Sequence, residues 1–276
     1  MRLNFIIQFK VEISYYCNKL ITIKIMYKLN KLYFIECIDS TESPHTNALA
    51  LYNDTATKLK ITDDSIETKY FEFKTKEDFF LILDSIYKDE ITNSNILIHI
   101  YTHGSSKLDG IIGNDKKLIT WEEIQNLTRK INIKSKNGLY LILALCHGIY
   151  IGEKISIKKK APFNSLIASK YEEYVTDIYK LFHTFYSNLV FDNNIVRAFK
   201  EAQVAEDTFF YKNTNICVQD AFKSLLEKRE KHLPILYKEY LKNVPGEKIS
   251  FEEFDKINRQ TFPEIIKNME EEFFIK

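Results

Sequence analysis

The chain is poor in the residues that support disulfide frameworks and zinc-binding cysteine clusters. Its 276 residues include four cysteines, five prolines, seven glycines and one tryptophan. The cysteines have no regular spacing and form no Cys-x-x-Cys pair, which argues against a disulfide scaffold or a four-cysteine zinc site. They are Cys17, Cys37, Cys146 and Cys217. We therefore expect a reducing compartment and assign the protein to the cytoplasm.

Long apolar runs are also missing. No run reaches the roughly 18 residues that a membrane-spanning helix requires. The apolar stretch at residues 3–9 is broken by Lys10 and Glu12, and no small-residue cleavage site follows it. A signal peptide is therefore not expected, and neither is a membrane partner.

The charge is balanced, with 39 lysines and arginines against 38 aspartates and glutamates, for a net charge of +1. A dedicated nucleic-acid-binding protein usually carries a strong positive excess, so nucleic acid is not an expected partner. Apolar residues make up 45% of the chain, which is enough for a sizeable globular core.

Short apolar runs alternate with segments of helical periodicity over most of the chain. Strands separated by helices are typical of a parallel sheet covered on both faces. Two helix starts have the capping-box pattern, with Thr75 and Thr120 each followed three residues later by an acidic residue. The predicted strands are 32–38, 70–73, 96–102, 139–145 and 165–169, and the predicted helices include 47–60, 120–130, 171–190 and 193–204.

The pattern suggests three parts. Residues 1–25 have no clean period, and we expect them to form an N-terminal extension outside the fold. Residues 26–205 carry the alternating strands and helices of the main domain. Residues 206–276 are predicted to be a helical C-terminal extension.

Two of the predicted strands end at reactive side chains. One runs into His103 and Gly104, and the other runs into Cys146. Active sites of parallel sheets lie at the carboxyl ends of the strands, so His103 and Cys146 are expected to meet there. An imidazole can take the proton of a thiol and so activate it as a nucleophile. The backbone N–H groups of Gly104 and Cys146 are the candidate donors to an oxyanion.

This order of motifs resembles the caspase-like clan of cysteine peptidases, and within it the bacterial CHAT-type domains. The resemblance covers roughly residues 30–205. It rests on the His-x-x-x-His-Gly strand end at 99–104, on Gly110-Ile111, on the helix opened by Thr120, and on Cys146 after a later strand. It also includes the strand 167–169 and the helical segments 185–189 and 198–202.

The resemblance implies a three-layer, caspase-like α/β fold with a central, mainly parallel sheet. It further implies a cysteine endopeptidase with a His103–Cys146 dyad, acting on a protein substrate without a cofactor. An activating protein partner and a role in bacterial defence or regulated cell death would follow. One departure concerns specificity: Leu145 and His147 flank Cys146, where caspases have Gln-Ala-Cys-x-Gly. The caspase preference for aspartate therefore has no support here.

Two alternatives stay open. The chain could be a catalytically weak, caspase-like module for protein interactions. It could also be a metal-dependent hydrolase, since His99, His103, Cys146 and His147 are all acceptable zinc ligands. Side-chain alternation along a strand separates Cys146 from His147, so we expect no metal site.

Three neighbouring residues have expected supporting roles. His99 shares a strand face with His103 and is expected to be a structural residue. Glu36 and Asp39 lie at the end of the first predicted strand and are candidates to orient His103, as is a backbone carbonyl.

Overall fold

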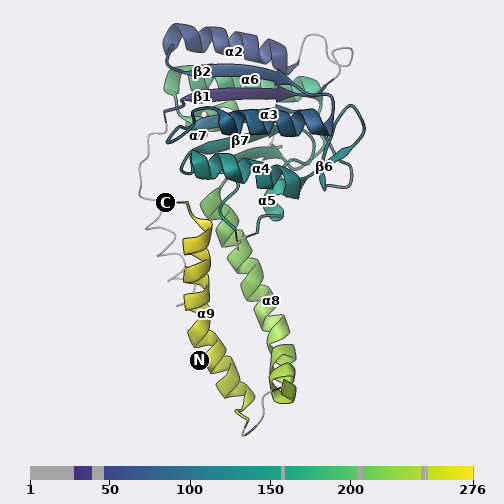
Figure 1. Cartoon of the computed structure of the whole chain (residues 1–276), viewed down its shortest axis with the longest axis vertical. Helices are drawn as coiled ribbons and strands as arrows, with labels where there is room; N and C mark the ends of the chain where they lie inside the picture. The colour runs from purple at the N-terminus through teal and green to yellow at the C-terminus, as the bar shows by residue number, and fades with distance from the viewer. Residues whose placement is uncertain are drawn as a thin grey trace.

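A six-stranded sheet forms the centre of the protein (Figure 1). The computed structural model describes residues 28–38, 47–156, 159–203, 208–243, 246 and 248–275. The strand order is β2-β1-β3-β7-β8-β9, and β9 alone runs antiparallel to its neighbour. The strands are β1 (Lys31–Glu36), β2 (Glu67–Glu72), β3 (Ile96–Tyr101), β7 (Leu139–Ala144), β8 (Ser165–Ser169) and β9 (Phe209–Asn213). The predicted extension at residues 1–25 lies outside the described residues.

Helices cover both faces of the sheet (Figure 1). One face packs against α3 (Lys76–Lys88), α4 (Trp121–Lys134) and the short α5 (Tyr150–Glu153). The other packs against α2 (Ala48–Thr62), α6 (Val175–Asp192) and α7 (Ile195–Ala202). The prediction of a three-layer α/β fold around a mainly parallel sheet is therefore confirmed.

The central strands are apolar throughout because both of their faces are buried. On β3, Ile96, Ile98 and Ile100 point into the core formed with α3 and α4. Leu97 and Tyr101 alternate with them and point into the core formed with α2 and α6. This alternation places every second residue of β3 on the same face of the sheet.

Capping boxes fix where α3 and α4 begin. The Thr75 hydroxyl accepts from the backbone of Asp78, and the Asp78 carboxylate accepts from the backbone of Thr75. Thr120 and Glu123 form the same pair at α4. Both helix starts were predicted from sequence, because each reciprocal pair satisfies N–H groups that the helix itself leaves open.

The Glu36 carboxylate caps α2. It accepts hydrogen bonds from the backbone N–H groups of Ala48 at 2.9 Å and Leu49 at 3.1 Å, and from the Tyr70 hydroxyl at 2.7 Å. The carboxylate is thus occupied at the start of α2, so the expectation that Glu36 orients His103 was wrong. Asp39, the other candidate, lies outside the described residues.

A small second sheet carries the predicted histidine. It consists of β4 (His103–Gly104), β5 (Gly110–Ile112) and β6 (Leu118–Thr120), all antiparallel. Through β4, β5 and β6 the chain passes from the end of β3 to the start of α4. His103 pairs with Ile112 in this sheet.

The C-terminal part differs from the prediction at its beginning. Residues 209–213, expected within a helical extension, form β9 and pair with β8 at the edge of the main sheet. Two long helices follow, α8 (Thr214–Asn243) and α9 (Phe251–Phe273), and Figure 1 shows them as a hairpin that projects away from the sheet. The division of the chain into domains stays a prediction.

None of the described helices combines the length and apolarity needed to cross a membrane.

The end of α9 returns to the main domain. Phe273 is 1% exposed, and its carbonyl accepts from the backbone N–H of Ala161 at 2.9 Å. The Lys160 ammonium donates to the carbonyls of Glu271 and Phe274. These contacts fasten the hairpin to the segment that precedes β8.

Candidate active site

His103 and Cys146 occupy matching positions beyond two neighbouring strands. β3 and β7 are parallel, and Tyr101 is the register partner of Ala144. His103 and Cys146 each follow two residues after this pair. Paired strands lie about 4.8 Å apart, so side chains at matching positions can reach each other. Among the described residues, the His103 side chain is exposed and Cys146 is half-buried.

Gly104 lies against the main chain of Cys146. A Cβ atom built on Gly104 would lie 1.9 Å from the carbonyl oxygen of Cys146 and 2.9 Å from its carbonyl carbon. No side chain fits in that space, so the approach of the two segments depends on glycine. The residues predicted to supply oxyanion donors are therefore neighbours in space.

The Cys146 sulfur lies against the loop that follows β8. The backbone N–H of Glu173 donates to the sulfur at 3.3 Å, and the Glu173 carbonyl lies 3.9 Å from it. The sulfur is therefore tied to the loop after β8 through the main chain of Glu173.

Sequence reasoning missed this loop, residues 170–174. The buried Ser169 hydroxyl organises it, donating to the Glu173 carboxylate at 2.7 Å and accepting from the Tyr171 backbone N–H at 3.0 Å. The argument that singled out the ends of β3 and β7 applies equally to the end of β8. Polar residues directly after that strand were the available signal.

His147 forms the turn after Cys146. Its φ of 63° lies in the left-handed region, which histidine adopts more readily than most residues. Its backbone N–H donates to the Tyr171 carbonyl at 3.1 Å, and its Nδ1 lies 3.1 Å from the Lys170 carbonyl. His147 thus joins the turn to the loop after β8.

His99 is a structural residue inside the core between the sheet and α6. It is completely buried, with its Nδ1 2.8 Å from the Tyr186 hydroxyl and its ring stacked on Phe34. Its Nε2 has no hydrogen-bond partner among the described residues. Burial lowers the pKa of His99 to about 3, because the apolar surroundings disfavour the charged ring.

The four residues considered as zinc ligands do not gather around one point. His99 is directed at Tyr186, and His147 at the carbonyl of Lys170. Within the part of the chain that the structure describes, no three histidine, cysteine, aspartate or glutamate residues are grouped so as to hold a metal ion.

Comparison with known proteins gives the fold a distant counterpart. No protein-family model matches the chain, and no curated protein matches it. Among the solved structures that resemble it is the Drosophila initiator caspase Dronc, with a TM-score of 0.46 and 10% sequence identity. That match covers 70% of this chain and 83% of the caspase. A likeness at this level gives no information about activity.

Proposed function

We propose that the protein is a cysteine endopeptidase that cleaves a protein substrate through a His103–Cys146 dyad. The observation that carries the proposal is the β3–β7 register, which puts both residues two positions past a paired strand end. The contact of Gly104 with the Cys146 main chain supports it, since it brings the candidate oxyanion donors together.

The proposed reaction has two steps. His103 takes the thiol proton, and the Cys146 sulfur attacks the carbonyl carbon of the scissile peptide bond. The N–H groups of Gly104 and Cys146 hold the oxyanion that forms. The C–N bond then breaks, and His103 returns the proton to the leaving amine.

A thioester between Cys146 and the amino-terminal part of the substrate remains. Water attacks its carbonyl carbon while His103 accepts a proton. The carbon–sulfur bond breaks, the new carboxyl group leaves, and the proton returns to the thiolate. No cofactor is needed for either step.

The setting of this activity follows from the CHAT-type resemblance in the sequence. It suggests a cytoplasmic bacterial protease that a protein partner switches on, acting in defence or regulated cell death. The residues that flank Cys146, Leu145 and His147, do not indicate which side chain precedes the cleaved bond, so the proposal makes no claim about cleavage preference.

The direct test is a comparison of new protein N-termini produced by the wild type and by Cys146→Ala in the same cells. We expect a set of cleavages that the wild type makes and Cys146→Ala does not. Cys37→Ala is the matched control, because Cys37 is buried and donates to the Asn114 side chain at 3.3 Å. Identical N-termini from the wild type and Cys146→Ala would overturn the proposal.

A second candidate is a protein-interaction module. It is favoured by the α8–α9 hairpin, which projects from the sheet and exposes Ile235 and Leu236 at 52% and 45%. An interaction module would keep its cellular effect in Cys146→Ala and lose it when the hairpin surface is changed.

A further inference from the structure

The end of β8 is joined to the turn that carries Cys146. β7 and β8 are parallel neighbours, and main-chain hydrogen bonds continue between the two segments after both strands have ended. The Ile149 N–H donates to the Ser169 carbonyl at 2.9 Å, and the His147 N–H donates to the Tyr171 carbonyl at 3.1 Å. The turn after Cys146 is therefore fixed to the last residue of β8 and to the loop that follows it.

The Ser169 side chain lies inside this junction and is completely buried. Its hydroxyl donates to the Glu173 carboxylate at 2.7 Å, accepts from the Tyr171 N–H at 3.0 Å and lies 3.1 Å from the Tyr171 carbonyl. A hydrogen bond to a carboxylate is stronger than one between neutral groups. One buried hydroxyl thus holds the loop at two of its residues.

Glu173 carries this attachment to the candidate nucleophile. Its carboxylate is bound to the Ser169 hydroxyl, while its main-chain N–H donates to the Cys146 sulfur at 3.3 Å. Both contacts belong to one residue, so a shift of the Glu173 side chain also shifts the N–H group that the sulfur accepts from. Ser169 and the Cys146 sulfur are therefore connected through Glu173.

We propose that Ser169 is a positioning residue for Cys146, and that through Glu173 it holds the sulfur where His103 can take its proton. A nucleophile and its base keep a productive geometry only when surrounding groups fix both of them. Ser169 acts here through Glu173 rather than by touching the sulfur. This inference rests on the proposed function, because the position of the sulfur matters in this way only if His103 acts on it.

A matched pair of variants tests the role of the hydroxyl. Ser169→Thr keeps the hydroxyl, whereas Ser169→Val has nearly the same shape without it, and both are β-branched residues suited to a strand. The rate of Cys146 alkylation by iodoacetamide would be measured by peptide mapping. We expect Cys146 to react at least fivefold more slowly in Ser169→Val than in Ser169→Thr.

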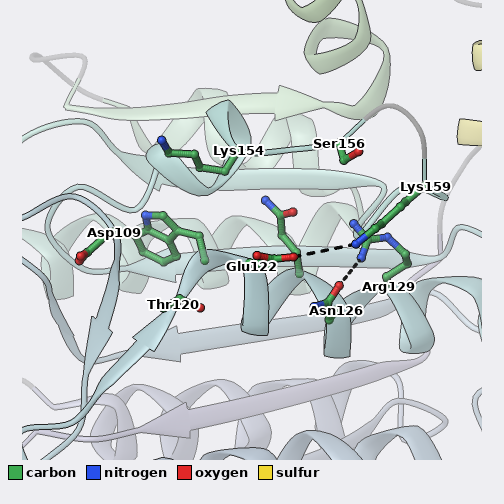
Figure 2. Close-up of a pocket in the computed structure, with 10 residues that line it drawn as sticks. Asp109, Thr120, Glu122, Asn126, Arg129, Lys154, Ser156 and Lys159 are labelled. Carbon is green, nitrogen blue, oxygen red and sulfur yellow. Dashed lines mark hydrogen bonds and ion pairs between the residues drawn. The ribbon is translucent and has the colours of Figure 1, made fainter.

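Ser156 provides the control pair, because it lies away from the candidate dyad. It lines a cavity of about 400 Å³ beside α4 (Figure 2), and that lining includes neither His103 nor Cys146. Ser156→Thr and Ser156→Val should therefore leave Cys146 with equal alkylation rates.

The same pair in a His103→Gln background separates positioning from general loosening of the loop. If Ser169 holds the sulfur for His103, the difference between threonine and valine at residue 169 should disappear once His103 is replaced, because the two effects are then coupled. A difference that persists in His103→Gln would overturn the positioning role. Equal rates in Ser169→Thr and Ser169→Val, while His103→Gln alone still slows Cys146, would overturn it as well and leave the dyad standing. An unchanged rate in His103→Gln alone would contradict the dyad and this inference together.

A second pair tests the same connection from Glu173, whose side chain is half-buried, and serves where Ser169→Val does not fold. Glu173→Gln keeps an acceptor oxygen for the Ser169 hydroxyl, and Glu173→Met removes it. Circular dichroism would establish that both variants are folded. We expect Cys146 to react at least fivefold more slowly in Glu173→Met than in Glu173→Gln, and equal rates would overturn the connection through Glu173.

Discussion

Gly104 and the main-chain carbonyl of Cys146 are in direct contact, so close that a Cβ on residue 104 would lie 1.9 Å from the carbonyl oxygen. The need for glycine here comes from this close approach, since no positive φ is found at Gly104. The contact joins the small sheet that carries His103 to the turn that carries Cys146. The distance between His103 and Cys146 therefore depends on residue 104 having no side chain.

Gly104→Ala should separate these two segments. The added methyl group must displace backbone atoms, and overpacking of this kind typically costs about 1–3 kcal/mol. We expect a lower free energy of unfolding in urea and slower alkylation of Cys146 by iodoacetamide. Gly152→Ala is the control, because a Cβ there meets only Leu166 at 3.6 Å, an ordinary contact. Equal behaviour of the two variants would show that the Gly104 contact is unimportant.

His99 should make the stability of the fold depend on pH. Its pKa falls from 6.5 to about 3 on burial, so the unfolded chain binds the proton more tightly than the folded protein between these values. The contribution of His99 to stability is therefore complete above pH 6.5 and is lost as the pH falls. The expected slope is about 1.4 kcal/mol per pH unit.

The measurement is the free energy of unfolding at several pH values from 7 to 4.5. His99→Asn keeps an acceptor for the Tyr186 hydroxyl but cannot titrate, so its stability should fall less steeply with decreasing pH. His232→Asn, at an exposed histidine on α8, should keep the wild-type slope. If His99→Asn keeps that slope as well, the proton linkage assigned to His99 is wrong.

Much of the fold could be predicted from sequence, because the apolar runs and the helix-capping residues are local patterns that coincide with the strands and helices of the folded protein. The apolar runs became β3 and β7, and the acids three residues after Thr75 and Thr120 marked helix starts. β9 could not be predicted this way. Residues 209–213 form a strand because they pair with β8 at the edge of the sheet, a long-range contact that local periodicity does not encode.

The site was predictable where it depends on strand ends and less so where it depends on loops. Each strand end has a fixed place in a parallel sheet, so His103 and Cys146 could be assigned to one edge. The contact of Glu173 with the Cys146 sulfur depends on how the loop after β8 folds, which no periodicity encodes. The role of Glu36 at α2 was likewise hidden, because its partners are backbone N–H groups.

Glu36→Ala should destabilise the protein without touching the candidate dyad. It removes the acceptor of the Ala48 and Leu49 N–H groups and of the Tyr70 hydroxyl. Leaving such buried donors unsatisfied costs about 1–3 kcal/mol. Urea unfolding would measure the loss, and Glu72→Ala, an exposed residue at the end of β2, should cost far less. Equal losses would contradict the capping role of Glu36.

Phe273→Ala should release the end of α9 from the main domain. Replacing a fully buried phenylalanine with alanine costs about 3–5 kcal/mol where the site cannot collapse. We expect faster hydrogen exchange at the Ala161 amide, which donates to the Phe273 carbonyl, and along α9. Exchange in β3 and β7 should stay slow. Unchanged exchange at Ala161 would mean that Phe273 does not fasten the hairpin.

The assignment of His103 as the base for Cys146 is tested most directly by the rate at which Cys146 is alkylated. Iodoacetamide labelling at pH 7, resolved for each cysteine by peptide mapping, would compare the wild type with His103→Gln and with the control His183→Gln. We predict that Cys146 reacts faster than Cys37 in the wild type and that His103→Gln slows Cys146 at least tenfold while His183→Gln does not. An unchanged rate at Cys146 in a folded His103→Gln variant would contradict the dyad.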